Sequence, residues 1–142
     1  GYFQNKEKFI PTIIKSLIER KKIPVYGKGN NIREWIYVED HVNALIHLSS
    51  NGQIGESYCV GSDNEFSNIN IVKKICKIFD ELTEYQDSIG LISFVEDRKG
   101  HDFRYAVNSN KIKMTGWSCE FDFEESLKKT VKWYLNNKNF LT

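Results

Sequence analysis

The sequence is poor in cysteine and proline. Its three cysteines, Cys59, Cys76 and Cys119, lie far apart and form no C-x-x-C pair. An odd and scattered set argues against a disulfide scaffold and against a zinc ribbon, and favours a reduced, cytoplasmic protein. With only two prolines, 40% hydrophobic residues and 27% charged residues, the composition excludes a disordered chain. A length of 142 residues predicts one globular domain, residues 1–142.

An excess of one charge is also missing, as are long apolar runs. The chain has 20 basic and 19 acidic residues, a net charge of +1. Proteins that bind nucleic acid or a membrane surface through charge carry a basic excess, so we expect neither partner. Any anion site must then be a local cluster. No apolar run approaches the roughly 20 residues that span a bilayer, and no signal peptide is visible.

Several catalytic motifs are absent. The patterns G-x-x-x-x-G-K-[ST], G-x-S-x-G and H-E-x-x-H do not occur. Gly27-x-Gly29 is half of a dinucleotide fingerprint, but no glycine-led helix follows it, so we interpret it as a turn. His101 has no ligand-like spacing to His41 or His47, and the chain lacks a Cys/His cluster, so we expect no metal site.

Hydrophobic periodicity predicts alternating helices and strands, which indicates a mixed α/β or α+β fold. Helices are expected over 7–21, 39–50, 71–84, 109–114 and from the Asp122–Glu125 capping box to 136. Asn70 is the expected N-cap of the third helix. Strands are expected over 23–26, 32–38, 56–60, 91–95 and 105–107. The predicted buried side of helix 39–50 consists of Val42, Leu45, Ile46 and Leu48.

The stretch from Ile23 to His41 contains the first candidate site. Two short strands flank a turn of glycines and asparagines, and a hairpin there would bring Tyr26 and Arg33 together. A flat ring beside a guanidinium suits a ligand with a base or sugar at one end and phosphate at the other. The alternative is an ordinary surface arginine on a strand.

A second cluster, Arg98 and His101, also lies at a strand end beside a glycine. Two separated cationic groups that converged would suit a diphosphate, because arginine binds phosphate oxygens bidentately. Asp97 and Asp102 in the same run are expected to form ion pairs with Arg98 and Arg104 rather than to act as acid and base. Asn68 is either a turn residue or an amide that contacts a ligand, and its surroundings favour the turn.

Together the motifs resemble the dTDP-glucose 4,6-dehydratase family of extended short-chain dehydrogenases/reductases. The matching stretches are YGKGNNIREWIYVEDH (26–41), YCVGSDNEFSN (58–68) and DRKGHDFRY (97–105). The resemblance implies a lyase that uses NAD to convert dTDP-glucose to its 4-keto-6-deoxy product. No glycine-rich NAD turn, Y-x-x-x-K pair or Thr-Asp-Glu dehydration set is present. The chain therefore resembles only the C-terminal, sugar-nucleotide-binding part, and we expect it to be inactive alone, with no catalytic residue.

By position, the resemblance implies a binding site for the nucleotide sugar. The matching residues are Lys8 and Phe9 beneath the nucleotide, Pro24 and Tyr26 beside the base and deoxyribose, Arg33 on the diphosphate, Asn68 nearby, and Arg98 with His101 at the closing side. Glu34, Lys99 and Phe103 depart from the family pattern, where Asp, Pro and Arg are usual, and none of the three is a presumed ligand contact.

The resemblance also implies that residues 39–62 complete a Rossmann domain that lies on the other part of such enzymes. Without that domain this segment would expose apolar faces, so we expect marginal stability or self-association. The parent enzyme is expected to be a homodimer. Two alternatives stay open: a UDP-sugar epimerase or decarboxylase of the same superfamily, and a stand-alone nucleotide-sugar-binding module without catalysis.

Overall fold

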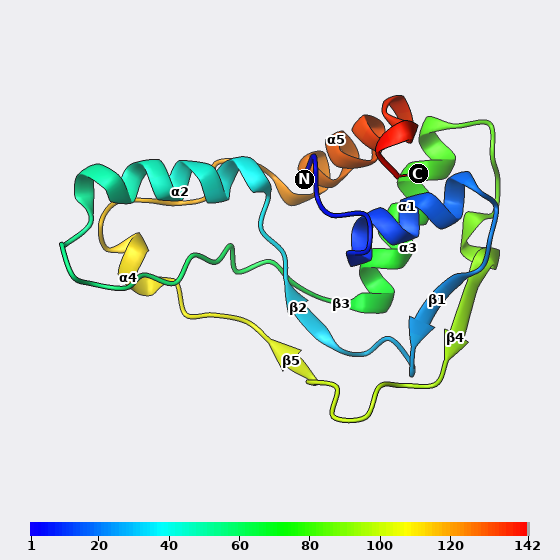
Figure 1. Ribbon diagram of the computed structural model, residues 1–142, viewed down its shortest axis with the longest axis horizontal. Helices are drawn as coiled ribbons and strands as arrows, with labels where there is room; N and C mark the ends of the chain where they lie inside the picture. Colours follow the sequence, from blue (N-terminus) through cyan, green and yellow to red (C-terminus); the bar gives the residue numbers. More distant parts are fainter. Residues whose placement is uncertain (142) are drawn as a thin grey trace.

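Three helices build the main core of the protein. In the computed structural model, which describes residues 1–141, α1 (Phe9–Ile18), α3 (Asn68–Leu82) and α5 (Phe123–Asn136) pack side by side (Figure 1). Their facing side chains, among them Ile14, Leu17, Ile75, Phe79 and Tyr134, are at most 1% exposed. The helical spacing of apolar residues predicted all three helices.

Two caps set where these helices begin. The Asp122 carboxylate accepts a hydrogen bond from the Glu125 N–H at 2.9 Å, which confirms the predicted capping residue of α5. The prediction for α3 was wrong, because Ser67 rather than Asn70 is its N-cap. The Ser67 hydroxyl accepts a bond from the Asn70 N–H, so Asn70 already lies inside the first turn.

Two small sheets lie below the helices in Figure 1. β1 (Ile23–Tyr26) pairs in parallel with β4 (Ile92–Val95). β2 (Ile32–Glu34) lies between β3 (Glu65–Ser67), which is antiparallel to it, and β5 (Arg104–Tyr105), which is parallel. The strand predicted over 32–38 is shorter in the structure, and the one predicted over 105–107 shares only Tyr105 with β5, whereas those over 23–26 and 91–95 are confirmed.

The expected hairpin between β1 and β2 does not form. A turn does follow Tyr26: Gly29 donates its N–H to the Tyr26 carbonyl, and Gly27 and Gly29 have φ of 55° and 69°. The turn connects β1 of one sheet to β2 of the other, and these two strands do not pair with each other. The Ile23 and Val25 side chains are buried, each with an exposed fraction of 1%. β1 pairs with β4, which lies almost seventy residues further along the chain.

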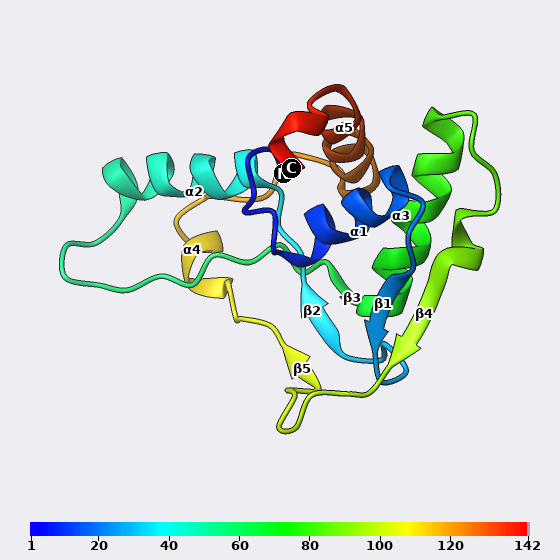
Figure 2. The same cartoon turned by 45° about the vertical axis from the view of Figure 1, so that its right-hand side comes forward.

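The remaining elements form a lobe beside the main core. α2 (Val38–Asn51) and the short α4 (Asn110–Lys113) pack around Ala44, Ile112 and Trp117. Figures 1 and 2 both show α2 extending away from α1, α3 and α5. The 3₁₀ turns η1 (Ser88–Leu91) and η2 (Lys138–Leu141) complete the fold. Among the described residues, no helix has the length and apolar character to cross a bilayer.

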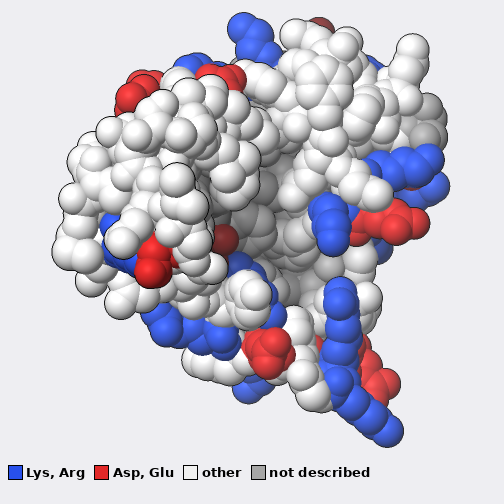
Figure 3. Space-filling model, turned by 60° about the vertical axis from the view of Figure 1, so that its left-hand side comes forward, with Lys and Arg blue, Asp and Glu red and all other residues white. Residues whose placement is uncertain are grey.

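Two predictions for this lobe were wrong. Most of the side of α2 that was predicted to be buried is exposed, with exposed fractions of 45% for Val42, 54% for Leu45 and 64% for Ile46; only Leu48 is half-buried, against the cluster around Ala44. Residues 56–60 are not a strand, because no described strand lies beside them to pair with. Figure 3, which turns the α2 side forward, shows that much of the forward lobe carries neither basic nor acidic side chains.

Candidate sugar-nucleotide site

The loop between β4 and β5 brings three predicted ligand residues together. The Arg98 guanidinium carbon lies 4.3 Å from the centre of the Tyr26 ring, a cation–π distance. The His101 ring meets the same Tyr26 ring edge to face, with 6.5 Å between centroids. A phenol from the end of β1 thus has a guanidinium and an imidazole from the 97–102 loop around it.

Asp97 holds this loop in shape. His101 Nδ1 lies 2.8 Å from Asp97 Oδ1, and that oxygen also accepts the Arg98 backbone N–H at 2.8 Å. The hydrogen bond from His101 is the largest cause that lowers the pKa of the Asp97 carboxyl below its ordinary value. The ion-pair prediction was wrong: Asp97 pairs with His101, and Arg104 pairs with Glu65 on β3.

Arg33 is tied to the other end of the same loop. Its Nη2 donates to the Asp102 carbonyl at 2.9 Å, and its Nη1 donates to the Ile32 carbonyl at 2.7 Å. Asn31, which is 7% exposed, donates its side-chain amide to the same Asp102 carbonyl at 3.2 Å. Arg33 therefore lies beside the residue that follows His101. The role of Asn31 could not be predicted, because it lies in the run Gly27–Asn31, whose composition indicated only a turn.

The other predicted ligand residues come from neighbouring elements. Pro24 and Tyr26 share the outward face of β1, because Ile23 and Val25 alternate into the core. Asn68 is the first residue of α3, and its backbone N–H donates to the Asn31 carbonyl at 2.9 Å. It therefore begins a helix rather than occupying the expected turn.

Lys8 and Phe9 lie at the start of α1. Lys8 is the exposed residue before the helix, and the Phe9 ring packs against Trp35 at 5.8 Å between centroids. No described contact joins these two residues to Arg98 or His101. The structure therefore links Tyr26, Arg33, Arg98 and His101 through one loop, and places Lys8 and Phe9 on a separate element.

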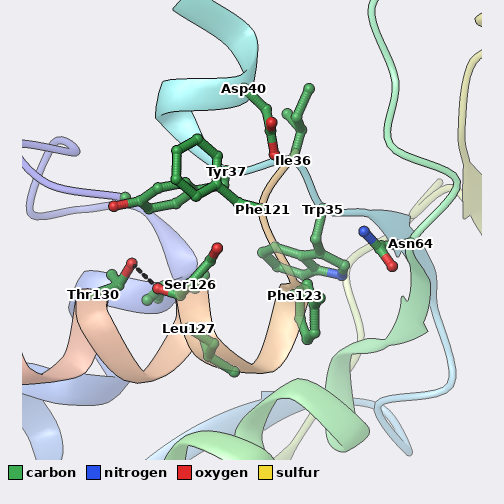
Figure 4. Close-up of a pocket in the computed structure, with 12 residues that line it drawn as sticks. Trp35, Ile36, Tyr37, Asp40, Asn64, Phe121, Phe123, Ser126, Leu127 and Thr130 are labelled. Atoms are coloured by element: carbon green, nitrogen blue, oxygen red, sulfur yellow. Dashed lines mark hydrogen bonds between the residues drawn. The ribbon is translucent and has the colours of Figure 1, made fainter. Parts of the chain in front are cut away.

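A cavity between β2, α2 and α5 lies outside this group. Figure 4 shows Trp35, Asp40, Phe121 and Ser126 among its lining residues, and none of the predicted ligand residues is among them. Trp35 Nε1 and Ser126 Oγ are buried there without a hydrogen-bond partner. Asp40 is 2% exposed and accepts the Glu120 N–H at 2.8 Å. The cavity is thus a mostly apolar gap beside Trp35 that contains a few buried polar groups, and it is separate from the predicted ligand residues.

The described residues include no metal-binding cluster, and their one glycine-rich turn is not built like a dinucleotide fingerprint. Residues 1–141 contain no group of three or more His, Cys, Asp or Glu side chains arranged to hold a metal ion. The Gly27–Gly29 turn leads from β1 into β2 instead of into a helix. A dinucleotide fingerprint needs the helix N-terminus to bind the pyrophosphate, so these residues do not fit NAD.

Comparison with known proteins decides the family. The model of the GDP-mannose 4,6 dehydratase family matches residues 3–130. The chain belongs to this family. Within it, a dTDP-glucose 4,6-dehydratase of Escherichia coli is 47% identical over 146 residues, and a probable dTDP-glucose 4,6-dehydratase of Sinorhizobium fredii is 46% identical over 139. These matches cover 99% and 96% of the chain but only 40% of each relative.

Solved structures of the family agree. A dTDP-glucose 4,6-dehydratase of Bacillus anthracis in complex with NAD superimposes with a TM-score of 0.86 at 36% identity, covering 98% of this chain and 42% of that one. DesIV of Streptomyces venezuelae, with NAD and dTDP bound, superimposes with a TM-score of 0.86 at 31% sequence identity, covering 99% of this chain and 42% of that one. The resemblance read from the motifs and the mixed α/β fold class, that of the C-terminal part of such an enzyme, are confirmed.

Proposed function

We propose that this chain binds the nucleotide sugar in a dTDP-glucose 4,6-dehydratase, an NAD-dependent lyase. The observation that carries the proposal is the convergence of Arg98 and His101 on Tyr26, with Arg33 fixed to the same loop. An aromatic face suits the base, and two guanidiniums with an imidazole suit a diphosphate. The sequence identity to dTDP-glucose 4,6-dehydratases supports the choice of thymine and glucose.

The chemistry itself is assigned to the rest of the parent enzyme. Relatives are about two and a half times as long as the segment that matches, and NAD is bound in the B. anthracis and S. venezuelae structures. This chain has no fitting NAD turn, so its own part is to hold and orient the substrate. We expect dTDP-glucose to bind without turnover. The scattered cysteines, all free, suit a cytoplasmic parent.

Residues 39–62 are proposed to pack on that missing NAD-binding domain. α2 exposes Val42, Leu45 and Ile46, and Ile54 in the following segment is fully exposed. An apolar face of this kind on a soluble domain marks a surface that another body covers. The irregular segment 56–60 would become a strand only when a neighbouring sheet supplies its hydrogen-bond partners.

The test is a titration of the chain with dTDP. Arg33→Ala and Arg98→Ala should each weaken binding by about tenfold or more, because hydrogen bonds to charged groups contribute about 1.5–3 kcal/mol. Arg20→Ala is the matched control: its guanidinium lies 4.8 Å from the Tyr85 ring centre, a similar contact remote from the site. Unchanged affinity in both site variants would refute the assignment.

Titration with UDP distinguishes the closest alternative. A dTDP-glucose enzyme should bind dTDP more tightly than UDP, whereas a UDP-sugar epimerase or decarboxylase would show the reverse. Solved UDP-sugar enzymes that resemble this chain are 15–22% identical to it, which supports a shared fold alone. Binding of dTDP with no effect of adding an NAD-binding partner domain would favour the stand-alone module.

A further inference from the structure

One carboxylate joins three separate parts of the site region. Glu34 Oε1 accepts the backbone N–H groups of Ser62 at 2.7 Å and Asp63 at 2.9 Å. Its other oxygen, Oε2, accepts the N–H of Val107 at 3.0 Å. A side chain at the end of β2 therefore satisfies backbone donors from two segments that lie 28 and 73 residues further along the chain.

The chain is shaped to let this carboxylate approach. Gly61 is buried, and a Cβ added to it would collide with Glu34 Oε1 and crowd the Val107 side chain. The next residue, Ser62, donates its hydroxyl to the carbonyl of Trp35, the residue after β2, at 2.7 Å, which is a second contact between these two segments. Residues 61–63 therefore contact the Glu34 carboxylate directly, through two backbone N–H groups and the close approach of Gly61.

The same contacts restrain the segment that leaves the candidate site. β5 has only two residues, both exposed, so few packed side chains hold it in place. Asn31, Ile32 and Arg33 bind its near end, at the carbonyls of Asp102 and Phe103. Glu34 binds its far end, at Val107. The consecutive residues 31–34, which include β2, therefore fix both ends of the segment that follows His101.

We propose that Glu34 is a positioning residue for the diphosphate part of the site. It holds the far end of β5 so that the 97–102 loop keeps Arg98 and His101 beside Arg33. Both carboxylate oxygens are needed, because the amide nitrogen of a glutamine cannot accept from an N–H. The inference rests on the proposed function, since it names what the site positions.

Amide hydrogen exchange tests the contact without any ligand. In Glu34→Gln, the amides of Ser62, Asp63, Val107 and the 98–103 loop should exchange about tenfold faster or more, as one broken hydrogen bond to a charged group predicts. Glu124→Gln, which alters an exposed carboxylate of α5 paired with Lys74, should leave these rates unchanged. Unchanged exchange in the 98–103 loop of Glu34→Gln would overturn the proposal.

Binding then separates positioning from general stability. By NMR titration, Glu34→Gln should weaken dTDP about fivefold to tenfold and leave the affinity for thymidine, which has no phosphate, unchanged. An equal loss of affinity for dTDP and for thymidine would mean that Glu34 supports the fold in general, and would overturn the positioning role. If the unaltered chain bound neither ligand, the proposed function and the diphosphate role would both fall, whereas faster exchange would still establish the contact itself.

Discussion

At the scale of single residues, the three free thiols have unequal surroundings. Burial raises the pKa of Cys76 to about 12 and that of Cys119 to about 11, whereas the Cys59 side chain is exposed. Because the thiolate is the reactive form, Cys59 should be alkylated by iodoacetamide about a hundredfold faster than Cys76 at pH 8. Mass spectrometry of timed samples measures this.

Cys59→Ser provides the control, since it should abolish the fast labelling and leave the slow labelling as it was. Comparable rates at Cys59 and Cys76 in the folded chain would contradict the burial of the α3 thiol.

The pair of Asp97 and His101 predicts a dependence of stability on pH. The pKa of Asp97 in the folded chain lies below its unfolded value of about 4. The ionised carboxylate therefore stabilises the fold above that pH, and this contribution disappears as the pH falls through the lowered pKa. Asp97→Asn should be less stable than the unaltered chain at pH 7 and equally stable at low pH, as urea unfolding would show.

His101→Ala checks the cause of that shift. Without the hydrogen bond from the imidazole, the pKa of Asp97 should move back toward its ordinary value, which carboxyl-detected NMR measures directly. A carboxyl that titrates identically in both chains would assign the lowered pKa to another group.

Residue types alone indicated part of the candidate site. Tyr26, Arg33, Arg98 and His101 could be singled out because they are cationic or aromatic groups next to glycine turns at strand ends. Their convergence depends on Asp97 and on the Asp102 carbonyl. A backbone carbonyl leaves no mark in the sequence, so the tie between Arg33 and the loop could not be predicted.

At the scale of elements, local signals succeeded where partners are close in the chain. Helix periodicity and the D-x-x-E box needed only neighbouring residues, and α5 begins where they predicted. The prediction of strand pairing failed because pairing depends on segments that are distant in the sequence. The turn after Tyr26 has the composition of a hairpin turn, yet β1 pairs with β4 and β2 pairs with β3 and β5.

The cap of α5 gives a prediction about one element. Asp122→Ala removes the acceptor for the Glu125 N–H and should lower the free energy of unfolding by about 1 kcal/mol. Urea unfolding with an unchanged m-value measures the loss. Asp122→Asn keeps an oxygen at the same place and should recover most of it. Equal destabilisation by both variants would show that the carboxylate acts by something other than capping.

At the scale of the whole molecule, one wrong prediction is informative. The pattern of Val42, Leu45 and Ile46 correctly identified an apolar side of α2, but that side is exposed. An apolar pattern in the sequence indicates that one side of a helix is buried in the complete protein, but it does not identify the domain that buries it. The match to only 40% of the relatives' length fits a cover that lies on the rest of the parent enzyme.

The exposed side of α2 predicts how the isolated chain behaves in solution. Two copies can bury this side against each other, so the chain should self-associate as its concentration rises. Leu45→Gln with Ile46→Gln should shift sedimentation velocity profiles toward monomer. Ile89→Gln alters a similarly exposed residue in η1, distant from α2, and should not. A cooperative thermal transition from a stable monomer of the unaltered chain, at the same concentrations, would show that α2 needs no cover.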